Sequence, residues 1–377
     1  MIIELLKPIN EEEFNSLKSK KRGSIGEEIQ IYTENLGFPD LDSTDIAIIG
    51  ISETRNSFFE STHFNLSNLR KEFYQLNLGK WKKSISDLGN LPNGETTNDT
   101  YHAISELCLF LRKKKIITII VGGSNDIIFP IFKSYSNFNK KVNIVLVDNQ
   151  FDLHQEEDLL SSRSYMNKII IDDSSKLNDF TNLGYQRHLC SPDEIDLMEK
   201  LFFDYISLGD LIGDHKSAEP ILRDAHIIGL DMKALSWISS GNFDNGNPNG
   251  IDSRLICILS RYSGISDKSR FFGLFELLNN PISNKLYAQI IWYFIEGVNS
   301  RFLEPLFNDS TGFIKYNVSV SGRDLVFIKS KRSDRWWLEI ILSDNDEKRY
   351  LPCLETDYNS ALKDNIPDRW FRAIKRN

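Results

Sequence analysis

The sequence has few cysteines, and it contains no long apolar run. The cysteines stand far apart with no paired spacing, which argues against a disulfide framework or a cysteine-rich zinc site. They are Cys108, Cys190, Cys257 and Cys353. No stretch reaches the roughly 18 apolar residues that a membrane span needs, and residues 1–14 lack the features of a secretory signal. We therefore expect reduced thiols, a cytoplasmic location and no membrane partner.

The charge balance argues against nucleic acid as a partner. The formal net charge is -8, whereas nucleic-acid-binding surfaces are basic. One basic cluster at residues 18–22 is interpreted as a solvated loop. The apolar content of 41% is enough for a sizeable core in a chain of 377 residues.

From about residue 45, short apolar runs alternate with amphipathic stretches, which predicts a parallel sheet covered by helices. A capping box with proline at the first helical position predicts a helix that begins after Ser191. Apolar residues at helical spacing predict another helix over residues 284–300. The expected strands span residues 46–51, 116–121, 142–147, 168–171, 205–208, 226–230 and 271–275.

Past about residue 306 the pattern changes to alternating strands around a turn-rich segment. Residues 325–329 and 336–342 flank the turn and predict a hairpin. We therefore divide the chain into an N-terminal extension, an α/β domain and a C-terminal extension that contains a β-hairpin. The ranges are residues 1–40, 41–305 and 306–377.

Three polar clusters follow expected strands, where the ligand sites of parallel sheets lie. They occupy residues 122–126, 148–152 and 231–233. Alternate residues of an extended segment share a face, which groups the side chains at 148, 150 and 152 and those at 231 and 233. An aspartate after a strand is more often a cap or turn residue, so the order and spacing of the clusters matter more than any one of them.

The three clusters resemble the signatures of the arginase, agmatinase and formimidoylglutamase (ureohydrolase) superfamily, closest to the formimidoylglutamase branch. Those signatures are a Gly-Gly-Ser/Asp-His-Asp/Ser turn, an Asp-Ala-His-x-Asp strand end and a Ser-x-Asp-x-Asp strand end. The resemblance covers about residues 40–305, with supporting segments at 86–90, 183–187, 247–250 and 272–276. It implies an arginase-like three-layer αβα fold with a mostly parallel sheet, here with a C-terminal β-rich extension.

In that family six side chains hold two manganese ions, and a bridging hydroxide attacks the guanidinium or amidine carbon of the substrate. The resemblance carries these ligand positions onto Asn125, Asp148, Gln150, Asp152, Asp231 and Lys233. Amides thus replace both histidines, and an ammonium replaces one carboxylate. Amide oxygens suit hard cations but substitute poorly for imidazole at a transition metal. We expect Lys233 to pair with Asp148 and Asp231 and to fill the place of the second ion.

Two interpretations follow from these substitutions. The favoured one is a non-catalytic arginase-fold protein with a binding, regulatory or assembly role. It would hold at most one divalent cation (Mg, Mn or Ca) through the residues Asn125, Asp148, Asp152 and Asp231. The alternative is a metal-dependent hydrolase of a guanidino or formimino substrate, acting on a linear amidine.

Three further features lie near these clusters or in the tail. Glu276 matches the family's glutamate that holds the substrate's cationic end, or it is a solvated carboxylate. His154 and His188 lie outside the ligand positions, and we expect neither to be catalytic. The tail's aromatic and basic residues either form a surface for a protein partner or self-association or pack the tail onto the body. They are Trp336, Trp337, Arg369, Trp370, Phe371 and Arg372. Relatives form trimers, hexamers and other rings, so an oligomer is also expected, although the tail could either create or block such contacts.

Overall fold

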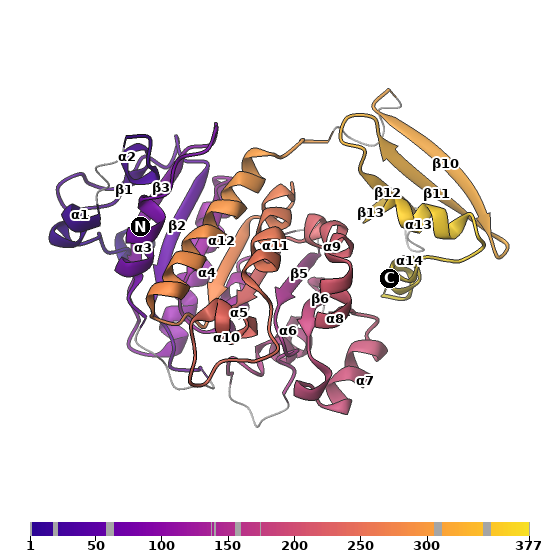
Figure 1. The fold of residues 1–377 in the computed structure, drawn as a ribbon, viewed down its shortest axis with the longest axis horizontal. Helices are drawn as coiled ribbons and strands as arrows, with labels where there is room; N and C mark the ends of the chain where they lie inside the picture. Colours follow the sequence, from indigo (N-terminus) through magenta and orange to yellow (C-terminus); the bar gives the residue numbers. More distant parts are fainter. Residues whose placement is uncertain are drawn as a thin grey trace.

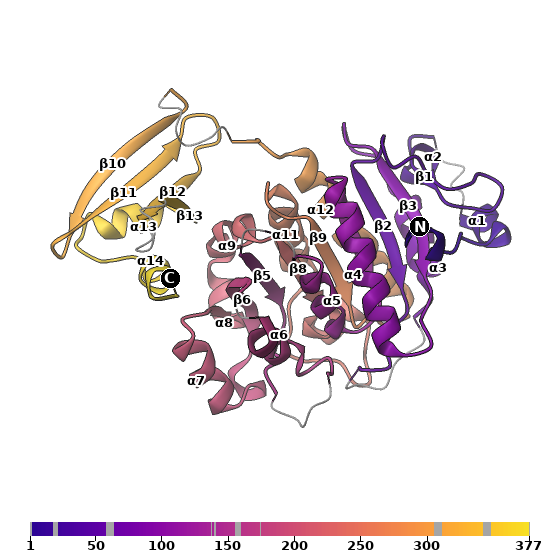
Figure 2. The same ribbon diagram turned by 180° about the vertical axis from the view of Figure 1, so that it is seen from behind.

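The computed structural model describes residues 2–17, 22–57, 64–136, 138, 141–154, 160–173, 175–304, 311–341 and 348–376. These residues form an α/β body and a C-terminal unit beside it (Figures 1 and 2). Of the basic cluster at residues 18–22, only Arg22 lies within the described part. No helix in these ranges is long and apolar enough to cross a membrane.

The body is built on a nine-stranded sheet in which every pair of neighbours is parallel. All residues of its central strands are buried, as expected for a parallel sheet that is covered on both faces. In spatial order the strands are β1 (Gln30–Ile31), β3 (Ile85–Leu91), β2 (Ile46–Ile51), β4 (Ile117–Val121), β9 (Phe271–Phe275), β8 (Ile227–Asp231), β5 (Val142–Val147), β6 (Leu177–Tyr185) and β7 (Asp204–Ser207).

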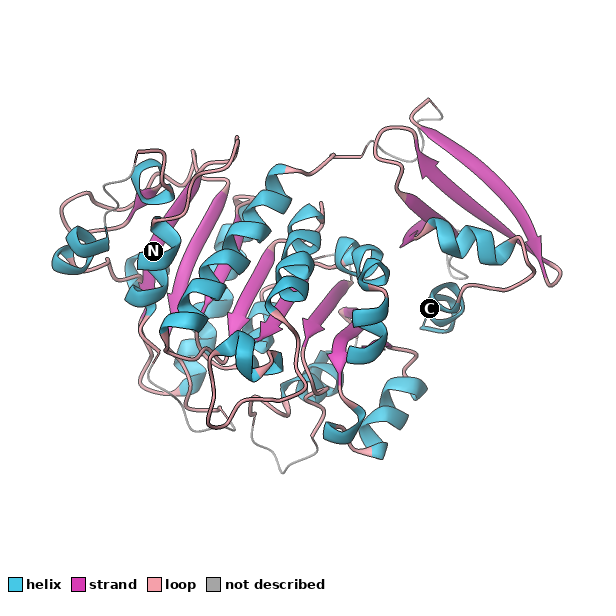
Figure 3. Ribbon diagram, viewed as in Figure 1, coloured by secondary structure: helices cyan, strands magenta, loops and turns pink. Residues whose placement is uncertain are grey.

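Helices cover both faces of this sheet, so the body has the predicted three layers (Figure 3). One face packs against α3 (Leu66–Tyr74), α8 (Leu208–Gly213), α9 (Ala218–Asp224), α11 (Ser253–Ile265) and α12 (Pro281–Asn299). The other packs against α4 (Thr97–Lys113), α5 (Ile128–Lys133), α6 (Tyr165–Asp173) and α7 (Pro192–Lys200). The short helices α1 (Glu11–Leu17), α2 (Ile25–Glu28) and α10 (Trp237–Ser240) complete the body.

Most expected strands are present, but the strand expected at residues 168–171 is wrong. That segment lies in helix α6, where Ile169 is buried and Ile171 is 71% exposed. A short apolar run alone does not distinguish a strand from one turn of helix. The polar strands β3 and β6 were not among the expected strands. In β3 the buried Asp87 is accommodated because Arg70 and Tyr74 donate hydrogen bonds to its carboxylate.

The C-terminal unit contains the predicted hairpin within a four-stranded antiparallel sheet. Its strands are β10 (Phe313–Val320), β11 (Arg323–Ser330), β12 (Trp336–Ile341) and β13 (Lys348–Cys353), and its helices are α13 (Glu355–Ala361) and α14 (Asp368–Arg376). Trp336, Trp337 and Trp370 are only 5–7% exposed. Trp336 stacks with Tyr316 and Tyr358. Trp336 and Trp370 belong to the unit's own core, whereas the ring of Trp337 lies 4.6 Å from the guanidinium of Arg223 on α9 of the body.

The C-terminal unit contacts the body through arginines that meet buried aspartates. Arg376 lies 2.7 Å from Asp179, and Arg349 lies 3.5 Å from Asp224. These aspartates lie near the amino-terminal ends of the sheet's strands. Burial raises the pKa of Asp179 to about 7, although the charge of Arg376 opposes this shift. The contact between the C-terminal unit and the body thus depends on arginines of the unit that compensate the negative charge of buried aspartates in the body.

Replacing Arg376 by methionine should destabilise the protein by about 3 kcal/mol at pH 8, because a carboxylate at Asp179 would stay buried without its nearest cation. Urea denaturation followed by tryptophan fluorescence measures this change. Arg332 is exposed on the same unit, so Arg332→Met is the matched control and should stay within about 0.5 kcal/mol of the wild type. Equal effects of the two variants would show that the ion pair does not hold the unit in place.

Candidate functional site

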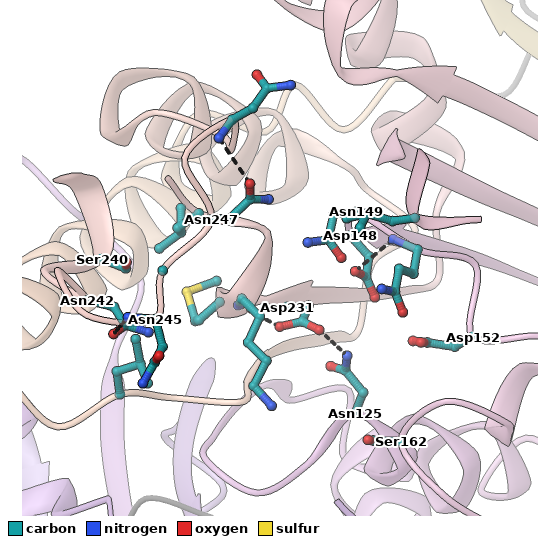
Figure 4. Close-up of a pocket in the computed structure, with 18 of the residues that line it drawn as sticks. Asn125, Asp148, Asn149, Asp152, Ser162, Asp231, Ser240, Asn242, Asn245 and Asn247 are labelled. Carbon is teal, nitrogen blue, oxygen red and sulfur yellow. Dashed lines mark hydrogen bonds between the residues drawn. The ribbon is translucent and has the colours of Figure 1, made fainter. Parts of the chain in front are cut away.

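The predicted site residues meet in one cavity at the carboxyl edge of the sheet. Strands β4, β9, β8 and β5 are consecutive neighbours, so the loops that follow them converge. They border a cavity of about 790 Å³ (Figure 4). All of the positions predicted from the family signatures line it: Asn125, Asp148, Gln150, Asp152, Asp231 and Lys233.

A glycine pair turns the chain after β4 and places Asn125 at the cavity. Gly122 and Gly123 have φ values of +94° and +78°, which only glycine adopts readily. A Cβ atom at Gly122 would overlap the carbonyl oxygen of Ile51. The next residues form a short 3-10 helix over Asn125–Ile127. The sequence at this turn therefore fixes the position of Asn125 next to β8.

Protein donors satisfy both oxygens of the Asp231 carboxylate. The Asn125 side-chain amide donates to Asp231 Oδ2 at 2.7 Å, as the dashed line in Figure 4 shows. The main-chain N–H of Lys233 donates to Asp231 Oδ1 at 2.6 Å. The side-chain amide of Asn125 therefore points its nitrogen, rather than its oxygen, toward the carboxylate of Asp231.

The ammonium of Lys233 forms its ion pair with Glu276, at 2.8 Å. The expectation that it would pair with Asp148 and Asp231 is therefore corrected. Glu276 follows β9, the neighbour of β8, and its carboxylate accepts from the hydroxyl of Ser57. Because Glu276 is only 8% exposed, it is not a solvated carboxylate. Because Asp231 already accepts a hydrogen bond from Asn125, Glu276 is the carboxylate that pairs with the ammonium of Lys233.

Asp148 and Asp152 face the same cavity from the β5 end and are only 2% and 4% exposed. The main-chain N–H of Gln150 donates to Asp148, whereas the Oδ2 atom of Asp152 is buried with no hydrogen-bond partner in the described structure. Burial raises the pKa of both carboxyls well above the usual range, and the neighbouring carboxylates raise it further. Burial and Asp148 likewise raise the pKa of Asp231, with Lys233 opposing.

The histidines and the rim complete the site. His188 lines the cavity, and His154 is not among its lining residues. The rim segment 242–249 was not predicted as a whole, although its last residues lie in the segment 247–250 that supported the family resemblance. It contributes four asparagines to the lining, Asn242, Asn245, Asn247 and Asn249. Their density in eight residues is the signal in the sequence that could have identified this wall.

Replacing Asp152 by asparagine should stabilise the metal-free protein at pH 8. The pKa of Asp152 is higher in the folded protein than in the unfolded chain. Its contribution to the free energy of unfolding is therefore fully present below the unfolded-state pKa and is lost as the pH rises through the folded-state pKa. The amide keeps the shape but removes the repulsion, so we expect a gain of about 1.4 kcal/mol for each pKa unit of the shift. The gain should disappear toward pH 4. Denaturant titrations with chelator at both pH values measure it.

The matched control is Asp244→Asn, because Asp244 is an exposed carboxylate on the rim segment. It should change the free energy of unfolding by less than about 0.5 kcal/mol at either pH. A loss of stability in Asp152→Asn at pH 8 would mean that the buried charge of Asp152 is compensated in the folded protein.

Comparisons with known proteins agree with this arrangement. A family model described as the Arginase family matches residues 44–226, and no curated protein matches the chain. Formiminoglutamase of Trypanosoma cruzi with Mn2+ has a TM-score of 0.63 at 14% identity, covering 70% of this chain and 99% of that one. Formimidoylglutamase of Bacillus subtilis subsp. subtilis has 0.62 at 14%, covering 76% and 97%.

A third solved structure is the agmatine ureohydrolase of Thermoplasma volcanium, with a TM-score of 0.60 at 16% identity, covering 74% of this chain and 94% of that one. At these identities the solved structures share the fold of the body, and the family match adds the sequence relationship. The body has the fold of these formimidoylglutamase and agmatine ureohydrolase structures, and residues 44–226 match the Arginase family.

Proposed function

We propose that this chain is a non-catalytic member of the arginase family whose altered site serves as a binding pocket. The observation that carries the proposal is the ion pair between Lys233 and Glu276 at 2.8 Å. It places a protein cation at the end of β8, where the family signature has a metal-binding carboxylate. An ammonium has no lone pair for a metal, and its charge repels one.

The donor set argues against two manganese ions. Asn125 directs its amide nitrogen to Asp231. The two side chains are therefore hydrogen-bonded to each other and do not both point an oxygen atom at a shared metal site. Among the described residues, no group of three histidine, cysteine, aspartate or glutamate side chains is arranged to hold a metal ion. Without two ions to lower the pKa of a shared water, the family's hydroxide would not form near neutral pH.

The alternative is a hydrolase that uses one divalent ion, and one observation favours it. Asp148 and Asp152 are buried, and one Asp152 oxygen has no hydrogen-bond partner among the described residues. Buried carboxylates of this kind are compensated by protonation or by a cation. Asp148, Asp152 and Asp231 would then hold a single Mg, Mn or Ca ion, with Asn125 rotated to present its oxygen.

Metal content separates the two functions. We expect protein purified without chelators to contain well under one manganese per chain and to lack hydrolysis of agmatine or formimidoylglutamate. We also expect its melting temperature to be unchanged by manganese, because a ligand that does not bind the folded state cannot stabilise it. Elemental analysis, product assays and thermal melts measure these three quantities. Two manganese per chain, or turnover that a chelator abolishes, would rule out the non-catalytic function.

Variants at Lys233 test the role of its ammonium. Lys233→Ala should destabilise the protein by about 3 kcal/mol, because Glu276 would lose its cation. The triple variant Asn125→His, Gln150→His and Lys233→Asp restores the family's ligand types, and manganese should raise its melting temperature. Lys331 is exposed and forms no ion pair in the described structure, so Lys331→Ala is the matched control. Manganese stabilisation of the wild type equal to that of the triple variant would contradict the proposal.

A further inference from the structure

The lining of the cavity has unused hydrogen-bonding capacity that indicates what it binds. Four amide side chains on its walls have no hydrogen-bond partner within the described residues: Asn149, Gln150, Asn245 and Asn249. Each amide offers two N–H donors and one oxygen acceptor. Asn242 and Asn247 differ, because their side-chain oxygens accept main-chain N–H groups and so hold the rim in shape.

The amides lie on two sides of the cavity. Figure 4 shows Asn149 on the side of Asp148 and Asp152, and Asn245 on the opposite side, with Asp231 and Asn125 between them. On the side of Asn149, the lining residues Asp148 and Asp152 add carboxylate acceptors, and the buried Oδ2 atom of Asp152 has no hydrogen-bond partner in the described structure. A ligand that spans the cavity would therefore meet acceptors on one side and mixed donors and acceptors along the walls.

The lining also excludes some classes of ligand. Among the described residues, no phenylalanine, tyrosine or tryptophan lines the cavity, so this lining does not offer a nucleobase the aromatic stacking that usually holds it. Among the described residues, three carboxylates line the cavity, namely Asp148, Asp152 and Asp231, together with two cations, Lys233 and Arg163. The ammonium of Lys233 is held by Glu276. Carboxylates thus outnumber the cations of the lining, which disfavours phosphorylated and other anionic ligands.

We propose that the cavity binds a small, non-aromatic molecule with several hydroxyl groups and no negative charge, a sugar or polyol. Hydroxyl groups both donate and accept, as the amides do, and one of them would donate to Asp152. The cavity of about 790 Å³ lies within the roughly 300–1,000 Å³ range of small-molecule sites. The inference rests on the proposed function, since it assumes that no metal ion occupies the cavity. Neutral sugars and amino sugars share this chemistry.

Isothermal titration and ligand-observed NMR test the proposal on the full-length, metal-free protein. The neutral probes are glucose, galactose, mannose, sorbitol and myo-inositol. Two charged derivatives of glucose complete the set, the cationic glucosamine and the anionic glucuronate. We expect saturable binding of at least one neutral probe, glucosamine to bind at least as tightly as glucose, and glucuronate to bind at least about tenfold more weakly than glucosamine. No binding by any neutral probe or amino sugar, or tighter binding by glucuronate, would overturn the proposal.

The double variant Asn245→Ala and Asn249→Ala locates the bound probe. Both residues are exposed on the rim, so the fold should be unchanged, and the affinity should fall about tenfold through the lost hydrogen bonds. Asn317→Ala, an exposed asparagine on β10, is the matched control and should bind as the wild type does. Unchanged affinity in the double variant would place the probe elsewhere and contradict the inference.

Manganese content and agmatine hydrolysis, measured on the same sample, keep the two proposals separate. Two bound manganese ions with turnover would reject the non-catalytic function. A metal-free, inactive sample that binds none of these probes would reject only the sugar or polyol as ligand.

Discussion

Buried carboxylates at the carboxyl ends of the central strands impose the constraint that shapes this site. A parallel sheet brings the ends of β4, β9, β8 and β5 together, and each of the last three is followed or ended by acidic side chains that are buried. Charges buried in this way need donors, cations or protons. Here Asn125 bonds Asp231 and Lys233 pairs with Glu276. Burial still raises the pKa values of Asp148, Asp152 and Asp231.

Buried carboxylates also lie at the opposite edge of the sheet, where arginines rather than an amide and a lysine contact them. Asp179 and Asp204 lie at the start of β6 and β7 and are 5% and 7% exposed. Their cations come from the C-terminal unit, since Arg376 lies 2.7 Å from Asp179 and 3.9 Å from Asp204. The unit therefore completes the electrostatics of the body and also packs against it. Its position at the amino-terminal edge leaves the cavity side of the sheet uncovered by it.

Much of this architecture could be predicted from the sequence because apolar strands are local signals. β2, β5 and β9 begin and end where their apolar runs do, and the capping box at Ser191 begins α7 as expected. β3 and β6 could not be found in this way, because their buried polar residues depend on distant partners. For Asp87 these partners are on α3. Periodicity contains no information about such long-range bonds.

The site could be predicted at the level of which residues meet, but not of how they bond. The family signatures brought the six positions to one edge of the sheet, as the cavity lining shows. The predicted ion-pair partners of Lys233 were wrong, because sequence spacing does not tell which of several nearby carboxylates its ammonium will contact. That choice depends on which carboxylate already has a donor, and Asp231 has both Asn125 and a main-chain N–H.

The substitutions at the site are physically coupled, which explains why they occur together. An amide at 125 can donate to Asp231 only if no metal ion lies between them, because the ion would claim the same lone pairs. A lysine at 233 replaces a metal-binding carboxylate and supplies a cation to Glu276, which is not one of the six metal-ligand positions. With both present, Asp231 and Glu276 have hydrogen-bond or ion-pair partners within the protein, whereas the Oδ2 atom of Asp152 has none in the described structure.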